Sequence, residues 1–282
     1  MKGFAVLPGA PQMTTKPGKA QNSGVAASGP AALGDSTPVA LRDWDPKWAE
    51  ICLAITNGPL ADGVLAKKLV KRIAIAIRTS AARLDSKQMR QLIHGAIEAE
   101  ASRDEILMVV KMATIASIRS ISAGAAILVK EASMEELDLG TAVRKTRMKK
   151  AGDASSVIEK VKAAGLWNEE WDHVYFLALV WIEEFMLAVI SVYESKVLSR
   201  KEIELLNVAL GASHTPINAV GVQRHIGDAF RSGATVDEIV EVFKICVAET
   251  VGACNQVLPI LSDELSLAGR GSERAKSQAK SG

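Results

Sequence analysis

Cysteine is scarce in this sequence, and its placement excludes a disulfide-stabilised scaffold. The 282 residues contain three cysteines, Cys52, Cys246 and Cys254. An odd number of cysteines without a CxxC spacing argues against a disulfide framework and indicates a reducing compartment. Cys246 and Cys254 are predicted to lie in one helix, about 12 Å apart along its axis, which is too far for a disulfide bond.

An excess of one charge and an unbroken apolar run are also lacking. Lys and Arg number 34 against 32 Asp and Glu, a net charge of +2, so we expect neither a nucleic-acid nor a membrane partner. The longest apolar run, residues 174–193, is interrupted by Glu183 and Glu184, which favours a buried soluble helix over a membrane span. The apolar stretch at residues 4–7 is too short for a secretory signal. We therefore expect a cytoplasmic protein.

Several motifs that carry chemistry are absent. The sequence has no Gly-rich phosphate loop and no GxSxG motif. Its four histidines, His94, His173, His214 and His225, form no HxxxH or Cys/His cluster, so no metal site is expected. A basic run at residues 144–150 lacks interleaved aromatics, which favours a solvated helix face over a nucleic-acid patch.

What the sequence does contain is helix-forming apolar residues arranged as a repeat. Hydrophobic residues make up 48% and aromatics 4%, and apolar residues recur with helical spacing, so we predict an all-α protein. A shift of 133 residues aligns 48–132 with 181–265 without a gap, and eighteen of the 85 positions are identical. This length indicates a tandem duplication of a small helical domain. We predict a disordered arm at 1–40, a first repeat at 41–132, a helical basic linker at 133–170, a second repeat at 171–268 and a disordered tail at 269–282.

Sequence signals also predict where several helices begin. Ser102-x-x-Glu105, Ser199-x-x-Glu202 and Thr235-x-x-Glu238 each have the spacing of a capping box. Pro216 separates two further predicted helices, at roughly 200–213 and 218–231.

The two repeats differ in kind at a few positions, and these positions suggest where chemistry occurs. The second repeat has polar residues at His214, Thr215, His225, Cys254 and Asn255. At the matching positions the first repeat has mostly apolar residues: Ala81, Ala82, Leu92, Ile121 and Ser122. We infer that the first repeat is a degenerate structural partner and that the second contains a candidate site.

Roles can be assigned to the polar residues of the second repeat. His225 is the best acid/base candidate, because imidazole titrates near neutral pH. Glu204 is placed to orient an imidazole or to take a proton, and Arg224 or Arg200 to hold an anionic substrate. The alternative is structural, because a single histidine on a helix is more often a packed or surface residue. Cys254 would then be a small buried hydrophobe and Asn255 a helix cap.

Three runs of the second repeat resemble the carboxymuconolactone decarboxylase family. They are Leu198–Leu206, Ala212–Thr215 and Arg224–Ile239, while Cys254–Ile260 is similar to a longer subgroup that carries two such domains. The resemblance covers roughly residues 40–267 and implies the all-helical fold that the family shares with alkylhydroperoxidase D. It also implies a decarboxylase without a cofactor, active in aromatic compound catabolism, in which a histidine at the position of His225 transfers a proton.

The sequence departs from the family in two places. The peroxidase branch uses a CxxC pair, where this chain has Ser213-His214-Thr215-Pro216, so thiol peroxidase activity is rejected. The longer subgroup has a histidine where Pro216 stands.

The resulting hypothesis is a cofactor-free lyase acting on a small carboxylated lactone-like or aromatic-derived acid. Its catalytic residues would be His225, Glu204 and His214, and its substrate-binding residues Arg224, Ser213, Thr215, Cys254 and Asn255. The two-domain form implies a homotrimer that mimics a hexamer. The alternative is a non-catalytic scaffold or accessory subunit.

Overall fold

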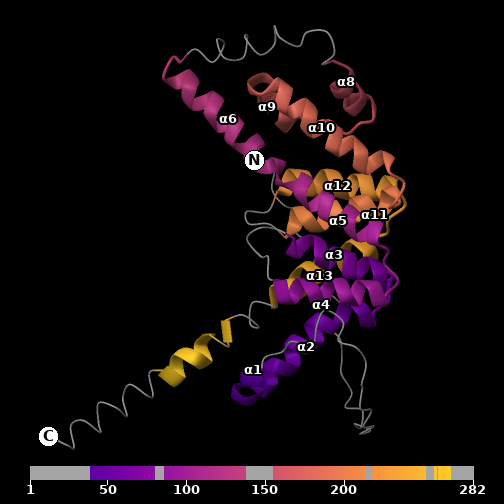
Figure 1. The fold of residues 1–282 in the computed structure, drawn as a ribbon, viewed down its shortest axis with the longest axis vertical. Coiled ribbons are helices and arrows are strands. Elements are labelled where there is room, and N and C mark those ends of the chain that lie inside the picture. The colour runs from indigo at the N-terminus through magenta and orange to yellow at the C-terminus, as the bar shows by residue number, and fades with distance from the viewer. Residues whose placement is uncertain are drawn as a thin grey trace, which may run out of the picture. The chain divides into compact units, whose positions relative to one another are not determined.

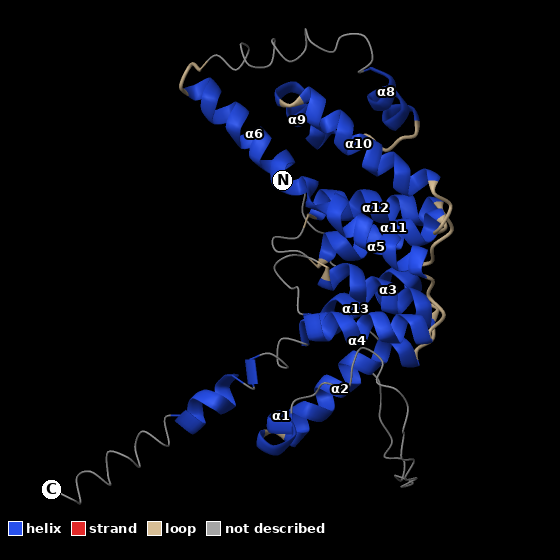
Figure 2. Ribbon diagram, viewed as in Figure 1, coloured by secondary structure: helices blue, strands red, loops and turns tan. Residues whose placement is uncertain are grey.

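The computed structural model describes residues 39–79, 86–137, 155–213, 218–251, 257–258 and 260–267, and in these ranges it is all-helical, without a β-strand. Figure 2 shows helices joined by short loops. In chain order (Figure 1) the elements are α1 (Val39–Trp44), α2 (Pro46–Ala61), α3 (Lys67–Arg78), α4 (Ser86–Glu98), α5 (Arg103–Ile115), the 3-10 turn η1 (Ala116–Ile118), α6 (Arg119–Met134), α8 (Ser155–Ala163), the 3-10 turn η2 (Glu169–Trp171), α9 (Asp172–Leu177), α10 (Leu179–Glu194), α11 (Arg200–Ala212), α12 (Ala219–Arg231) and α13 (Val236–Val251).

Helix starts agree with the predicted capping boxes. The Ser102 and Ser199 side chains accept a hydrogen bond from the backbone N–H three residues on, and Glu105 and Glu202 bond back to the cap. The Thr235 N–H donates to Glu238 Oε2 over 2.8 Å, and the Glu238 N–H donates to Thr235 Oγ1 over 3.1 Å. Each box therefore satisfies two donors that a helix N-terminus leaves without an intrahelical partner.

We propose that the helices arose by the duplication inferred from the sequence, and their bounds support this. When 133 is added to their residue numbers, the first and last residues of α1, α2 and α4 coincide with those of α9, α10 and α12. Left-handed backbone also recurs at two matched places, with φ of 66° at Gly63 and 54° at Lys196, and 64° at Glu100 and 87° at Gly233. Such a conformation favours glycine. In each matched pair one copy has glycine and the other has a different residue with the same left-handed backbone.

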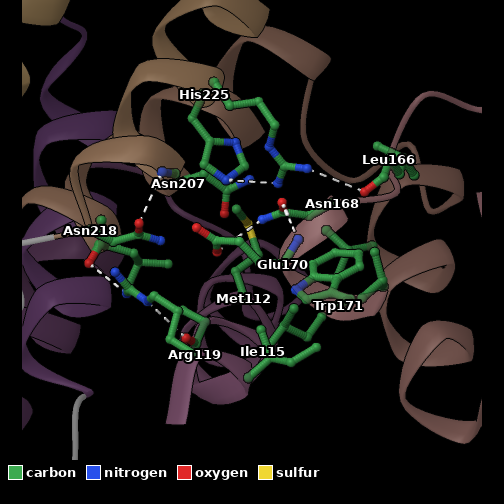
Figure 3. A pocket seen from close by; sticks show the side chains of 18 of the residues that line it. Met112, Ile115, Arg119, Leu166, Asn168, Glu170, Trp171, Asn207, Asn218 and His225 are labelled. Carbon is green, nitrogen blue, oxygen red and sulfur yellow. Dashed lines mark hydrogen bonds between the residues drawn. The ribbon is translucent and has the colours of Figure 1, made fainter. Parts of the chain in front are cut away.

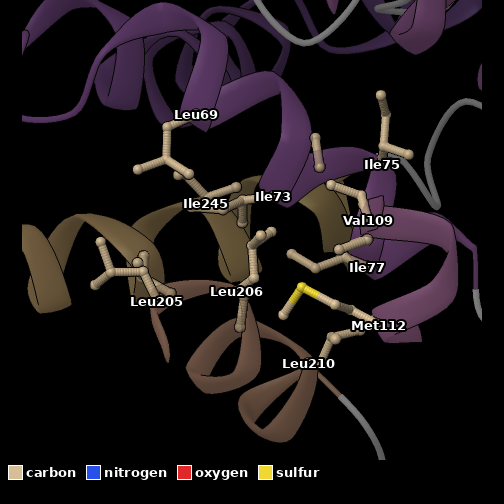
Figure 4. Close-up of a cluster of buried hydrophobic side chains, with 14 of the residues drawn as sticks. Leu69, Ile73, Ile75, Ile77, Val109, Met112, Leu205, Leu206, Leu210 and Ile245 are labelled. Carbon is tan, nitrogen blue, oxygen red and sulfur yellow. The ribbon is translucent and has the colours of Figure 1, made fainter. Parts of the chain in front are cut away.

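The two repeats share one hydrophobic core. Buried side chains of α3 and α5 from the first repeat pack among those of α11 and α13 from the second. Figure 4 shows Ile73 and Val109 beside Leu206 and Ile245 in this cluster. The guanidinium of the buried Arg72 also joins the repeats, because it pairs with both Glu105 and Glu202. The repeats are therefore halves of one packed unit.

A second cluster extends beyond the repeats. Ile158 and Val161 of α8, with Leu166 and Trp171, pack against α6 and α10. The part of the predicted linker that the structure describes thus belongs to the core. Its basic run at 144–150 lies outside the described residues.

One described helical stretch, Arg103–Met134, is long and apolar enough to span a membrane by length and composition. The α5 part buries Met108, Val109 and Met112, and Met108 and Val109 belong to the shared core. Of the apolar window, 22% is buried in the structure. The cytoplasmic location stays a prediction.

Replacing Ser199 with alanine is expected to lower the free energy of unfolding by about 0.5–2 kcal/mol, because α11 loses its N-cap. Urea unfolding followed by circular dichroism measures the change. The position that matches Ser199 in the first repeat is Ala66, which precedes α3 and provides no side-chain cap. A serine there would add the missing cap. Ala66→Ser is expected to raise stability, and a Ser199→Ala variant as stable as wild type would contradict the assigned cap.

Candidate active site

A cavity of about 90 Å³ lies where the second repeat meets segments from elsewhere in the chain (Figure 3). This volume is several times what one water molecule needs and suits a small organic molecule. Helices α10, α11 and α12 form part of its wall, and the end of α5, η1, the start of α6 and residues 166–171 complete it. Its polar lining residues are Arg119, Asn168, Glu170, Tyr193, Asn207, Asn218, Arg224 and His225.

Glu204 and His225 form a hydrogen-bonded pair beside this cavity. Glu204 is fully buried on α11, and its Oε2 lies 2.7 Å from Nδ1 of His225 on α12. On the other side, Nη2 of Arg224 lies 3.4 Å from His225 Nε2. Because a guanidinium can only donate, Nε2 is the acceptor and Nδ1 carries the proton that is donated to Glu204. In this tautomer the lone pair of His225 is on Nε2, where it faces the Arg224 guanidinium.

Arg224 lines the same wall as His225. Its Nη1 donates to the Leu166 carbonyl over 3.4 Å, and its guanidinium lies 5.8 Å from the centre of the Trp171 ring. These contacts hold a positive charge at the cavity beside the imidazole. A guanidinium in this place suits a carboxylate ligand, which it can bind with two parallel hydrogen bonds.

Arg200, the other arginine predicted to bind an anion, has a different place. Its Nε forms an ion pair with Glu204 Oε1 over 2.8 Å, and its guanidinium lies 4.3 Å from the centre of the Tyr193 ring. Arg200 does not line the cavity. Arg200 therefore balances the negative charge of the buried Glu204 carboxylate. Arg224 is then the candidate for binding the substrate carboxylate.

Of the remaining predicted site residues, the structure describes only Ser213. Ser213 caps the C-terminus of α11 and its hydroxyl donates to the Leu210 carbonyl over 3.5 Å, outside the cavity lining. His214, Thr215, Cys254 and Asn255 lie outside the described residues. Their roles stay predictions.

Several lining residues were missed by sequence reasoning. Tyr193 and Asn207 match Leu60 and Ala74 in the first repeat, so the comparison that singled out His225 also contained the signal for them. Arg119, Glu170 and Trp171 carried no such signal, because they lie outside the second repeat or at its edge. Arg119 donates to the carbonyls of Ala116 and Leu210, and burial lowers the pKa of its guanidinium.

Two positions that the 133-residue shift matches to the cavity lining have charged residues instead. Gly211 and Ala116 line the cavity, and the 133-residue shift matches them to Arg78 and Glu249. These two residues form a buried ion pair, in which Arg78 also donates to the Glu249 carbonyl. Lys71 stands at the position of Glu204, and burial lowers the pKa of its amine. These differences support the prediction that the first repeat has no equivalent site.

Glu204, His225 and Asp228 offer ligand atoms that all lie within 4.8 Å of one another, a spacing that a metal ion requires. Both carboxylates already have cationic partners, because Glu204 pairs with Arg200 and Asp228 with Arg231. A divalent cation would have to displace or oppose these guanidinium groups. The arrangement therefore fits a carboxylate that orients an imidazole better than a metal site.

Comparison with known proteins gives one informative likeness. The sequence matches no protein-family model and no curated protein. The structure is similar to the crystal structure of a "putative gamma-carboxymuconolactone decarboxylase subunit" from Burkholderia xenovorans LB400, with a TM-score of 0.69 and 24% sequence identity over 81% of this chain and 90% of that one. The chain therefore has the all-α, alkylhydroperoxidase D-like fold that its sequence predicts.

Proposed function

We propose that this chain belongs to the carboxymuconolactone decarboxylase family and is a cofactor-free decarboxylase of a small carboxylated lactone-like or aromatic-derived acid. The observation that carries the proposal is the Glu204–His225 hydrogen bond beside a cavity that Arg224 also lines. An oriented imidazole next to a carboxylate-binding group is what proton transfer to a bound acid requires. The fold likeness to a protein named as a decarboxylase subunit supports the same reaction class.

The proposed reaction balances without a further reactant. The substrate carboxylate breaks its C–C bond and leaves as CO2, and the electron pair moves into a conjugated carbonyl of the substrate. Once Arg224 binds the substrate carboxylate in place of Nε2, His225 takes a proton from solvent at Nε2 and delivers it to the carbon that lost CO2. Glu204 holds the ring through Nδ1 and balances the charge that appears when Nε2 is protonated. One proton is consumed for each CO2 released.

The proposal is tested by measuring CO2 release from a panel of small acids. The panel contains carboxylated lactones and acids with a carbonyl conjugated to the carbon that bears the carboxylate. Each acid is paired with its methyl ester, which cannot release CO2 by this route and therefore gives the background of the assay. We expect release from at least one acid and none from its ester. Failure of every acid in the panel would count against the decarboxylase and favour a non-catalytic subunit of this fold.

Replacing Arg224 with glutamine is expected to raise KM for the acid by about 10- to 100-fold, because hydrogen bonds to a charged group contribute about 1.5–3 kcal/mol. Steady-state kinetics of CO2 release measure this change. Arg231→Gln is the matched control, because Arg231 is on the same helix with an exposed side chain and pairs with Asp228. An unchanged KM in Arg224→Gln would remove Arg224 from substrate binding.

Peroxidase chemistry has no support in the described residues. Cys52 and Cys246 are buried, and neither lines the cavity. A dithiol peroxidase needs one thiol to attack the peroxide and a second to resolve the product.

A further inference from the structure

Tyr193 places a hydroxyl group at the cavity whose hydrogen has no acceptor within the described part of the chain. Tyr193 lies near the end of α10 and lines the cavity together with Asn207 of α11. Asn207 Nδ2 donates to the Tyr193 oxygen over 3.2 Å. Because this bond uses the oxygen as an acceptor, the hydroxyl hydrogen remains available for a bound molecule.

The surroundings of Tyr193 keep this hydrogen in place. Burial, and then the nearby Glu204 carboxylate, raise the pKa of the Tyr193 phenol well above its usual value, although Arg200 opposes the effect. The phenol is therefore a proton-bearing donor at neutral pH. The Arg200 guanidinium packs on the Tyr193 ring and also pairs with Glu204. Glu204 in turn orients His225, so Tyr193 and His225 are connected through the same carboxylate.

We propose that the Tyr193 hydroxyl is a further catalytic group, which donates a hydrogen bond to the substrate oxygen that becomes negative when CO2 leaves. The inference rests on the proposed decarboxylation, in which the electron pair of the broken C–C bond moves onto a carbonyl oxygen to give an enolate. Tyr193 stabilises that oxygen while keeping its own proton, and His225 supplies the proton that reaches carbon. Asn207 acts through Tyr193 and is a positioning residue.

The comparison of the repeats supports a functional use of this pair. The first repeat, where an ion pair occupies the matching place, has Leu60 and Ala74 at the positions of Tyr193 and Asn207. A leucine such as Leu60 fills space without a hydroxyl, whereas Tyr193 brings a hydroxyl to the cavity and Asn207 donates to its oxygen. The polar pair is thus present at the cavity and absent from the matching positions of the first repeat.

Tyr193→Phe is expected to lower kcat for CO2 release by about 10²–10³-fold with little change in KM, as for removal of one donor to a developing oxyanion. Tyr175→Phe is the matched control, because Tyr175 is the other tyrosine and packs on Trp167 away from the cavity. Its kcat is expected to stay at the wild-type value. A Tyr193→Phe variant with kcat within about threefold of wild type would overturn the inference.

A binding measurement separates this inference from the proposed reaction. The probe is 4-hydroxy-3-nitrobenzoate, a carboxylate whose absorbance reports the ionisation of its phenol. We expect the bound probe to be more ionised in wild type and Tyr175→Phe than in Tyr193→Phe, whether or not any acid releases CO2. Equal ionisation in all three proteins would overturn the assignment of Tyr193. If no acid released CO2 but the ionisation of the bound probe still depended on Tyr193, the proposed decarboxylase would be rejected. The assignment of the Tyr193 hydroxyl as a hydrogen-bond donor would be supported.

Discussion

Replacement of His225 by alanine is expected to lower kcat for CO2 release by about 10²–10⁴-fold, the usual contribution of a positioned acid or base. The carbon that loses CO2 must then take its proton from water. The His225 ring is largely buried, with 16% of its side chain exposed, so the variant leaves a small space beside Glu204. Steady-state assays on the most active acid of the panel measure the loss.

The control for this variant is His94→Ala. His94 lies on α4, the counterpart of α12, but its side chain is 75% exposed and pairs only with Glu98 among described residues. We expect wild-type turnover in His94→Ala. Circular dichroism and thermal unfolding of His225→Ala separate lost chemistry from lost folding. Turnover in a folded His225→Ala variant that equals wild type would remove His225 from the mechanism.

Glu204→Gln is expected to lower kcat by a similar factor, about 10²–10⁴, because an amide can hold the imidazole in the wrong tautomer and cannot balance its positive charge. The substitution preserves the size of a fully buried side chain, so the core keeps its packing. Arg200 loses its ion pair but is 43% exposed, so its charge can be solvated. The loss should therefore appear in kcat more than in stability.

Glu241→Gln gives the matched comparison. Glu241 is as fully buried as Glu204, and it lies on α13 outside the cavity lining. If Glu204 acts only by filling space, the two variants should retain equal turnover. A Glu204→Gln enzyme as active as Glu241→Gln would show that the carboxylate does not serve His225.

The candidate site combines residues of both repeats. Glu204 and His225 lie on α11 and α12, and the first repeat contributes the end of α5 and η1 to the cavity wall. The matching positions of the first repeat contain a lysine and a leucine, Lys71 and Leu92. At the positions that the shift matches to the lining residues Gly211 and Ala116, Arg78 and Glu249 form a buried ion pair.

The sequence by itself predicted the helices and showed that the two aligned segments differ at a few polar positions. Capping boxes at Ser102, Ser199 and Thr235 predict helix starts correctly because their hydrogen bonds join residues three apart. The ungapped 133-residue shift needs only the sequence, and the difference between Leu92 and His225 follows from it.

Only the tertiary structure decided which groups meet. Glu204 and His225 are 21 residues apart, Arg224 reaches the Leu166 carbonyl 58 residues away, and Arg119 reaches Leu210 91 residues away. Contacts of this kind depend on how the faces of α5, α10, α11 and α12 pack, and the periodicity of each helix says which face is apolar without naming its partner. The cavity and the availability of the Tyr193 hydroxyl therefore belong to the packed structure, because long-range packing alone brings those side chains together.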